Sequence, residues 1–321
     1  MSNPTLDISV VIPLLNEEES LIELTEWIRR VMQQHQYSYE IIMVDDGSTD
    51  HSWSIIENLS SRFSEIHGIK FFHHYGKAAA LQVAFAETKG KVVITMDADL
   101  QDSPDEIPAL YDMIIKEGYD LVSGWKKVRH DPLLTKRIPS KFYNWTVRKI
   151  SRIRLHDMNC GLKAYQYRVV KSIEVYGDMH RYIPVLAKWA GFKKIGEKVV
   201  QHQERKYGKS KFGLERFIRG PLDLLSVTFI TRFGRRPMHF FGVWGVVMFL
   251  LGGGVALYLL IEKIYKSLNN MPTRDVVDKP AFFLALLTII LGVQLFLAGF
   301  ISELISRNAY DRNKYQIEKK V

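Results

Sequence analysis

Short apolar runs alternate with amphipathic segments through the first part of the chain. The runs are rich in Val and Ile, which is typical of strands buried on both faces, over residues 8–15, 40–44, 66–72, 91–96 and 120–124. The segments between them have helical spacing or helix-start signals, over residues 20–34, 50–63, 77–88 and 104–117. This order predicts an α/β fold with a mostly parallel sheet and helices on both faces.

Two long uncharged runs, residues 240–261 and 281–301, dominate the last third of the chain. Each is long enough to cross a hydrocarbon core of roughly 30 Å, and a buried core helix is the less favoured alternative. Lys and Arg are slightly more numerous in the outer flanks than in the loop 262–279, so we predict that both termini are cytoplasmic. The preceding segment 217–233 fits an interfacial helix or a plain amphipathic core helix equally well.

The chain carries a formal net charge of +9, which favours anionic partners such as phosphates, anionic lipid or nucleic acid. Basic residues that flank membrane spans explain part of this excess. Nucleic acid is disfavoured, because no recognised nucleic-acid-binding motif accompanies the charge. The one cysteine, Cys160, cannot form an intrachain disulfide and fits a reducing compartment.

Polar side chains follow three of the predicted strands, at the end where parallel sheets bind ligands. They are Asn16 and Glu17 after the first strand, Asp45 and Asp46 after the second, and Asp97, Asp99 and Gln101 after the fourth. Clustered carboxylates repel one another unless a cation or hydrogen-bond donors join them. The sequence therefore predicts a ligand site here, with helix capping and turn formation as the alternative for Asp45 and Asp46.

Asp97, Asp99 and Gln101 alternate, and in an extended chain they share one face. Side-chain oxygens at that spacing suit a hard divalent cation, Mg²⁺ or Mn²⁺, which would bridge a diphosphate and neutralise a leaving group. We therefore predict a metal site at these residues, and a solvated turn is the alternative.

Three segments together resemble the family 2 glycosyltransferases of GT-A fold: ISVVIPLLNEE over residues 8–18, VDDGSTD over 44–50 and MDADLQ over 96–101. Within that family the chain is similar to the polyprenyl-phosphate glycosyltransferases, through the soluble region and the two C-terminal spans. The resemblance implies a Rossmann-like GT-A catalytic domain and two C-terminal transmembrane helices. The expected boundaries are 1–215 for the catalytic domain, 216–239 for interfacial helices, 240–302 for the transmembrane pair and 303–321 for a basic cytoplasmic tail.

The resemblance also implies roles on the donor side of the site. The nucleotide-sugar-binding residues would be Pro13, Asn16, Glu17, Asp45, Asp46, Gly76, Lys77, Asp97, Arg205 and Lys211. Among them, Asp45 would contact the base or ribose, while Arg205 and Lys211 in the basic loop 202–211 would clamp the diphosphate. The metal ligands would be Asp97, Asp99 and Gln101.

The acceptor side begins in a basic and aromatic stretch, residues 125–148. Its Arg137 and Ser140 form an Arg-X-X-Ser element that can bind a phosphate with a guanidinium fork and a hydroxyl. The resemblance assigns this element to the lipid phosphate, and a solvated basic helix is the alternative. It places Asp157 near the sugar and the attacking oxygen. The implied catalytic residues are Asp99, Asp157 and Arg205.

The function implied by the resemblance is sugar transfer with inversion from a nucleotide sugar to undecaprenyl or dolichyl phosphate. A UDP-sugar is the favoured donor, with glucose first. We expect a homo-oligomer, a tetramer by resemblance, in the bacterial inner membrane. A processive polysaccharide synthase is one alternative, but it would carry a Gln-X-X-Arg-Trp element and more spans, and no Arg-Trp pair occurs. A non-catalytic, membrane-tethered nucleotide-sugar-binding subunit is the other alternative, against which the set of acids argues.

Overall fold

A computed structural model describes most of the chain, and it divides into two compact units. The described residues are 4–127, 153–177, 179–203, 206, 237–272, 274–308 and 317–321. One unit contains the sheet and comprises Met1–Thr228 with Asn313–Val321, and the other comprises Phe229–Arg312. We call them the sheet unit and the helical unit.

The sheet unit is built on one mixed sheet of eight strands in the order β7-β5-β6-β4-β1-β2-β3-β8. Parallel pairing joins β4 to β1, β1 to β2, β2 to β3 and β5 to β7, whereas β6 runs antiparallel between β4 and β5. The strands are β1 (Leu6–Leu14), β2 (Tyr39–Asp45), β3 (Ile66–Phe71), β4 (Gly90–Thr95), β5 (Leu121–Trp125), β6 (Lys163–Gln166), β7 (Ile195–Val199) and β8 (Ile317–Lys320). The five predicted strands are present, and the predicted α/β class is confirmed.

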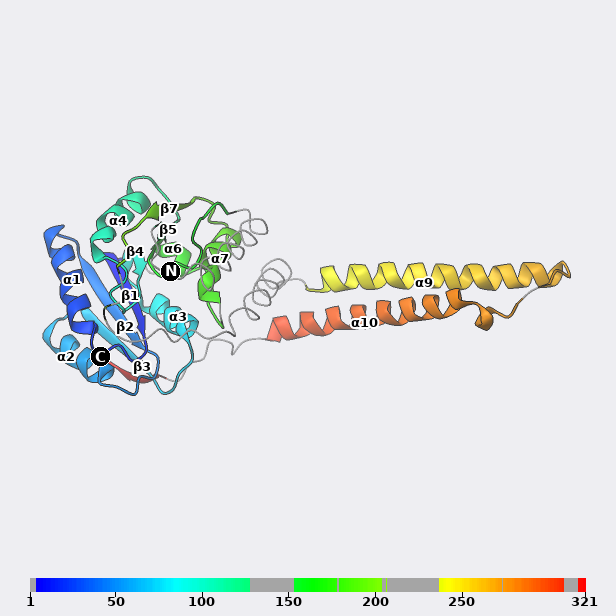
Figure 1. The fold of residues 1–321 in the computed structure, drawn as a ribbon, viewed down its shortest axis with the longest axis horizontal. Coiled ribbons are helices and arrows are strands. Elements are labelled where there is room, and N and C mark those ends of the chain that lie inside the picture. The colour runs from blue at the N-terminus through cyan, green and yellow to red at the C-terminus, as the bar shows by residue number, and fades with distance from the viewer. Residues whose placement is uncertain are drawn as a thin grey trace. The chain divides into compact units, whose positions relative to one another are not determined.

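Helices cover both faces of the sheet. They are α1 (Leu21–Gln34), α2 (Ser52–Arg62), α3 (Lys77–Glu87), α4 (Ile107–Ile115), α6 (Tyr167–Val170) and α7 (Ile183–Trp189), with 3₁₀ turns η1 (Pro104–Glu106) and η3 (Met179–Tyr182). One core forms where α1, α2 and α4 pack their apolar stripes on alternate residues of the strands. The alanine-rich α3 packs on the opposite face against β1 and β2 (Figure 1). Burial on both faces explains why the strands read as continuous apolar runs.

The C-terminal segment forms an edge strand that the sequence did not predict. Within the expected basic tail, β8 pairs antiparallel with β3, and Gly68 and Val321 exchange backbone hydrogen bonds of 2.9 and 3.0 Å. Lys70 and Glu318 add an ion pair of 3.0 Å across the two strands. Gly68 belongs to β3, and a Cβ at this position would lie 2.4 Å from a methyl of Ile56 in α2. Glycine therefore lets β3 pack closely against α2. All four residues of β8 are exposed, and lysines are common on exposed edge strands. The sequence IEKK therefore lacks the apolar pattern that would predict a strand.

The helical unit consists of two long antiparallel helices, α9 (Pro237–Leu268) and α10 (Pro280–Asn308), with a 3₁₀ turn η4 (Val276–Asp278) between them. Met238–Leu268 and Pro280–Ile305 are long and apolar enough to span a membrane, and only 17% and 11% of their most apolar stretches are buried. Such exposure suits lipid rather than a soluble core. The cytoplasmic orientation of both termini stays a prediction.

Glycines set the close approach of the two helices. A Cβ at Gly245 would lie 2.7 Å from the carbonyl oxygen of Gly292, and a Cβ at Gly292 would lie equally close to the carbonyl oxygen of Gly245. Gly252 likewise faces Ala285, whereas Gly253 and Gly254 have nothing within 4 Å. Small residues therefore pack the hairpin against itself, as is common between helices in membranes.

Removing residues 317–321 should destabilise the sheet unit, because the β3 edge loses its backbone partners. Each such hydrogen bond contributes about 1 kcal/mol, so we expect the thermal midpoint of the full chain in detergent to fall by about 5 °C, measured by near-ultraviolet circular dichroism. The control Lys319→Ala/Lys320→Ala keeps the strand and loses only exposed ion pairs, which contribute little. An unchanged midpoint after truncation would show that β8 contributes nothing.

Candidate active site

The loops that follow β1 and β2 are joined at the carboxyl end of the sheet. Asn16 adopts a left-handed conformation with φ of 54°, and its side-chain oxygen accepts the backbone N–H of Thr49 at 2.8 Å. Ser48 and Ser52 accept in return the backbone N–H groups of Asn16 (2.8 Å) and Glu17 (3.0 Å). The structure thus brings the predicted Asn16 and Glu17 beside the acidic loop after β2. Pro13 lies within β1 opposite Val44 of β2.

Asp45 is buried with half of its carboxylate unused. Oδ1 accepts the N–H of Ser48 at 2.8 Å, while Oδ2 has no hydrogen-bond partner within the described part of the chain. Burial raises the pKa of this carboxyl group. A buried acceptor without a donor is costly, so Oδ2 is the atom of this loop best placed to accept a hydrogen bond from a ligand.

Asp46 has a different role, because its carboxylate is occupied by the next loop. Oδ1 accepts the N–H of Tyr75 at 2.8 Å, and Oδ2 accepts the N–H of Gly76 at 2.9 Å and contacts Nδ1 of His74 at 2.8 Å. Gly76 has φ of 99°, a conformation that favours glycine, and Lys77 begins α3 directly after it. Asp46 therefore positions the turn that delivers Lys77 to the site.

Lys77 forms an ion pair with Asp97, which follows β4. Burial would raise the pKa of Asp97, but the ammonium groups of Lys77, Lys126 and Lys163 outweigh it and lower this pKa to about 2. A Cβ at Gly161 would lie 2.5 Å from Oδ2 of Asp97, so only glycine leaves room for the carboxylate. Asp97 is therefore held ionised in a confined place.

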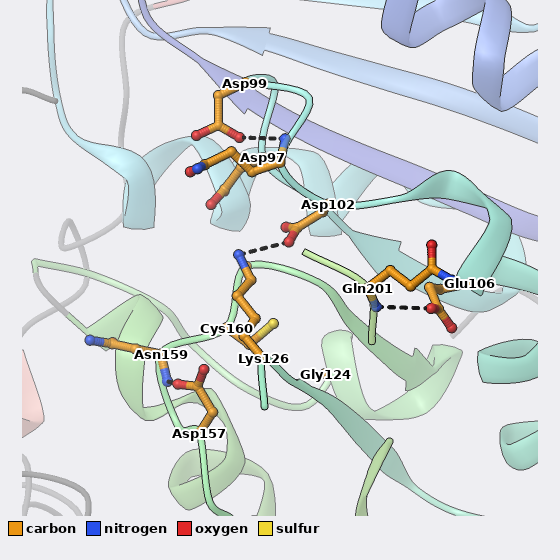
Figure 2. A network of polar contacts seen from close by, with 12 residues as sticks. Asp97, Asp99, Asp102, Glu106, Gly124, Lys126, Asp157, Asn159, Cys160 and Gln201 are labelled. Carbon is orange, nitrogen blue, oxygen red and sulfur yellow. Dashed lines mark hydrogen bonds and ion pairs between the residues drawn. The ribbon is translucent and has the colours of Figure 1, made fainter. Parts of the chain in front are cut away.

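The chain bends after Asp97 instead of continuing as an extended strand. Leu100 has φ of 59°, and Oδ1 of Asp99 accepts the N–H of Gln101 at 3.2 Å (Figure 2). The carbonyl oxygen of Gln101 accepts the N–H of Gln203 at 2.9 Å. The alternation that suggested one shared face for Asp97, Asp99 and Gln101 thus does not describe this backbone, and the role of Gln101 stays a prediction.

Asp97 and Asp99 fit a divalent cation that binds together with a diphosphate. Within the described ranges, no group of three or more His, Cys, Asp or Glu side chains could hold a metal ion by itself. Mg²⁺ typically takes one or two carboxylates from the protein and completes its shell with phosphate oxygens and water. The carboxylate pair therefore suits an ion whose remaining ligands are phosphate oxygens and water.

Strand β6 explains how Asp157 reaches the same end of the sheet. Because β6 is antiparallel to β4, its first residue, Lys163, lies opposite Thr95, the last residue of β4. The loop that carries Asp157 precedes β6 and so meets the loop after β4. Asp157 is buried, and its Oδ1 accepts the N–H of Asn159 at 3.1 Å (Figure 2).

A buried ion pair connects the loops on the two sides. Nζ of Lys126, which follows β5, lies 2.7 Å from Oδ1 of the fully buried Asp102 (Figure 2). Burial raises the pKa of Asp102, and the nearby Asp102 carboxylate raises the pKa of Lys126 against the effect of its own burial. Asp102 also pairs through its backbone with His202, three residues before Arg205. The pair therefore joins three loops.

Sequence reasoning found part of this site. Arg137, Ser140, Arg205 and Lys211 lie outside the described residues, so their roles stay predictions. Asp102 was missed although it directly follows the Asp97–Gln101 motif, and Lys126 was only one basic residue among several. A buried partner is what distinguishes them, and the pairing of two residues so far apart along the chain is not visible in a single sequence.

Comparisons with known proteins agree with this geometry. The model of the family "Glycosyl transferase family 2" matches residues 9–173. Dodecaprenyl-phosphate galacturonate synthase of Rhizobium johnstonii is 35% identical over 313 residues, covering 95% of this chain and 89% of that protein. Undecaprenyl-phosphate 4-deoxy-4-formamido-L-arabinose transferase of Pseudomonas fluorescens is 33% identical, covering 97% and 89%.

Solved structures support the fold. A complex of glucosyl-3-phosphoglycerate synthase from Mycobacterium tuberculosis with Mn²⁺, uridine-diphosphate-glucose and phosphoglyceric acid superposes with a TM-score of 0.52 at 20% identity. The match covers 70% of this chain and 79% of that one. At this identity the similarity shows a shared GT-A-like fold of the sheet unit.

The Asp102–Lys126 pair should position the Asp97–Asp99 loop as well as stabilise it. Breaking a buried pair from one side costs about 3–5 kcal/mol, so Asp102→Leu and Lys126→Met should each lower the thermal midpoint. The double variant should regain stability, since neither charge is left alone. We still expect its Mn²⁺ affinity in the presence of UDP, measured by electron paramagnetic resonance, to fall about tenfold or more.

The partly buried pair of Arg29 and Glu65, 3.1 Å apart and distant in the sequence from these loops, gives the control variant Arg29→Met, which should keep the Mn²⁺ affinity. Lys126→Arg, which keeps the charge, should retain part of it. A stable double variant with wild-type Mn²⁺ affinity would contradict a positioning role.

Proposed function

The chain belongs to glycosyltransferase family 2, among its polyprenyl-phosphate sugar transferases, and from this premise we propose that it transfers a sugar from a nucleotide donor to a polyprenyl phosphate. The observation that carries the proposal is the meeting of two loops. The antiparallel insertion of β6 places the Asp157 loop against the Asp97–Asp99 loop. A donor held at one loop would therefore present its anomeric carbon to an acceptor at the other.

On the donor side, Oδ2 of Asp45 would accept a hydrogen bond from the base or ribose, beside Asn16 and Glu17. Asp97 and Asp99 would hold a divalent cation, which when bound would stabilise the departing diphosphate. Lys77 now contacts Asp97, and we propose that its ammonium turns to the diphosphate when the donor binds. Arg205 and Lys211 are proposed to clamp the same diphosphate.

On the acceptor side, an oxygen of the lipid phosphate would attack the anomeric carbon opposite the leaving diphosphate, so that configuration inverts. A phosphate monoester has a second pKa near 6 and is largely dianionic at neutral pH, so the nucleophile needs little deprotonation. Asp157 would then orient the sugar or acceptor rather than serve as an obligatory base. Arg137 and Ser140 are the proposed contacts of the lipid phosphate.

The identity of the sugar belongs to this proposal. UDP-glucose was the first choice from the sequence, but the two relatives are named for galacturonate and 4-deoxy-4-formamido-L-arabinose. We therefore place UDP-sugars of these two kinds beside UDP-glucose as donors. Both termini and the sheet unit are proposed to be cytoplasmic at a bacterial inner membrane, in a homo-oligomer.

A donor screen tests the proposal. Detergent-solubilised full chain, undecaprenyl phosphate and Mg²⁺ or Mn²⁺ are combined with each UDP- or GDP-sugar, and nucleotide release is measured with and without the lipid. We expect lipid-dependent release from one donor, no release after chelation of the metal, and a loss of turnover of about a hundredfold or more in folded Asp99→Ala. Donor binding without turnover would favour a binding subunit, and a growing polysaccharide product would favour a processive synthase.

A further inference from the structure

Three lysines approach the acids of the site, and two of these lysines are paired with a carboxylate. Lys77 contacts Asp97, and Lys126 contacts Asp102. The third, Lys163, is 3% exposed and begins β6, between β4 and β5. Among the residues that the structure describes, Lys163 makes no ion pair, and its Nζ donates only to the backbone carbonyl oxygen of Cys160.

Lys163 lies where the donor is proposed to bind. It is opposite Thr95, two residues before Asp97, and the charges of Asp157, Lys77 and Asp97 all act on it. Lys163 and its neighbour Tyr165 face away from the core formed with α1 and α4, because Leu162 and Ala164 fill that core. The ammonium therefore belongs to the sheet face that also carries α3 and Lys77.

A second buried polar group adjoins this place. His180, in the turn η3 that packs against α3, has an Nδ1 that is buried and has no hydrogen-bond partner within the described residues. Burial together with the charges of Lys77, Arg181 and Lys163 lowers the pKa of His180 to about 3, so the ring is neutral. On this face, within the described part of the chain, the Nδ1 atom of a neutral imidazole thus has no hydrogen-bond partner, and a buried ammonium has a backbone carbonyl but no counter-ion.

An unpaired ammonium is expensive to bury. Proteins normally give a buried charge a counter-ion, and a single carbonyl oxygen offsets only part of the lost hydration. Accordingly, burial lowers the pKa of Lys163, against the raising effect of the nearby acids. An anionic ligand oxygen would supply the missing partner in a dry site, where such a contact is strong.

We infer that Lys163 binds an anionic oxygen group of the donor, either the diphosphate or a carboxylate on the sugar, with His180 beside it. The inference rests on the proposed function and adds a residue that the sequence motifs did not indicate. A carboxylate would select uronic acid donors, whereas a diphosphate contact would serve any nucleotide sugar. Both are oxyanions, so the same ammonium suits either, and ligand comparison separates them.

Four ligands distinguish the sources: uridine, UDP, UDP-glucose and UDP-galacturonate. Their dissociation constants are measured by calorimetry on the full chain with Mg²⁺, in wild type and in Lys163→Met. We expect Lys163→Met to weaken at least one anionic ligand about tenfold or more and to leave uridine unchanged. If Lys163→Met loses affinity equally for UDP and both UDP-sugars, the group bound by Lys163 is the diphosphate. If the loss of affinity is confined to UDP-galacturonate, that group is the sugar carboxylate.

Lys171 provides a matched control, because its Nζ donates to the backbone carbonyls of Phe85 (2.6 Å) and Ala86 (2.8 Å) and burial also lowers its pKa. Lys171→Met should keep the affinity for all four ligands. Without ligand, Lys163→Met should be at least as thermally stable as wild type, since an unpaired buried charge is removed. If Lys163 had only a structural role, the same substitution would lower the thermal stability of the protein.

Unchanged affinity for UDP and both sugars in folded Lys163→Met would overturn the inference. The inference would also be overturned if the only defect of Lys163→Met were a raised KM for undecaprenyl phosphate, because Lys163 would then bind the phosphate of the acceptor and not the donor. The donor screen on the wild-type chain is independent of either result. Lipid-dependent turnover by the wild type with normal donor binding by Lys163→Met would leave the proposed function standing and remove only the role of Lys163.

Discussion

Mutual repulsion among buried carboxylates is the constraint on which the architecture of the site depends. Asp45, Asp46, Asp97 and Asp102 all lie at the carboxyl ends of the central strands. Asp45, Asp46 and Asp102 have almost no access to water, and the side chain of Asp97 is 34% exposed. Asp45 accepts the N–H of Ser48, and Asp46 is stabilised by backbone N–H groups and a histidine. Asp97 pairs with Lys77, and Asp102 pairs with Lys126. These contacts determine the conformation of the loops, because each loop must hold its donor or cation next to one particular carboxylate.

The antiparallel strand β6 brings further residues to the same end of the sheet as these carboxylates. In a purely parallel sheet, the residues that precede one strand lie at the opposite end of the sheet from the residues that follow the neighbouring strand. Reversing one strand brings the Asp157 loop, Gly161 and Lys163 to the end where β4 delivers Asp97. The same reversal leaves Lys163 buried among acids that already have other partners. The fold therefore brings the acidic loops together and leaves beside them a buried ammonium that has no carboxylate partner among the described residues.

The helical unit solves a different physical problem. Its side chains are largely exposed, so the two helices are held together by the direct approach of Gly245 to Gly292 and of Gly252 to Ala285 rather than by a large apolar core. Exposed apolar surface on this scale is stable only when another apolar medium covers it. Its composition thus agrees with the relatives named for dodecaprenyl phosphate and undecaprenyl phosphate.

The sequence by itself determined the strands β1 to β5, the two long apolar helices and the acids that follow β1, β2 and β4, because hydrophobic periodicity and local turn signals are properties of neighbouring residues. Only the tertiary structure decided what those acids do. Asp45 and Asp46 are adjacent and equivalent in the sequence, yet one keeps an oxygen without a hydrogen-bond partner among the described residues and the other holds the turn before Lys77. Lys126 and Lys163 are likewise two of many lysines in the sequence, but in the part of the chain that the structure describes only Lys126 has a carboxylate partner. Pairing of this kind depends on strand order and burial, which bring distant residues together, and no local pattern encodes it.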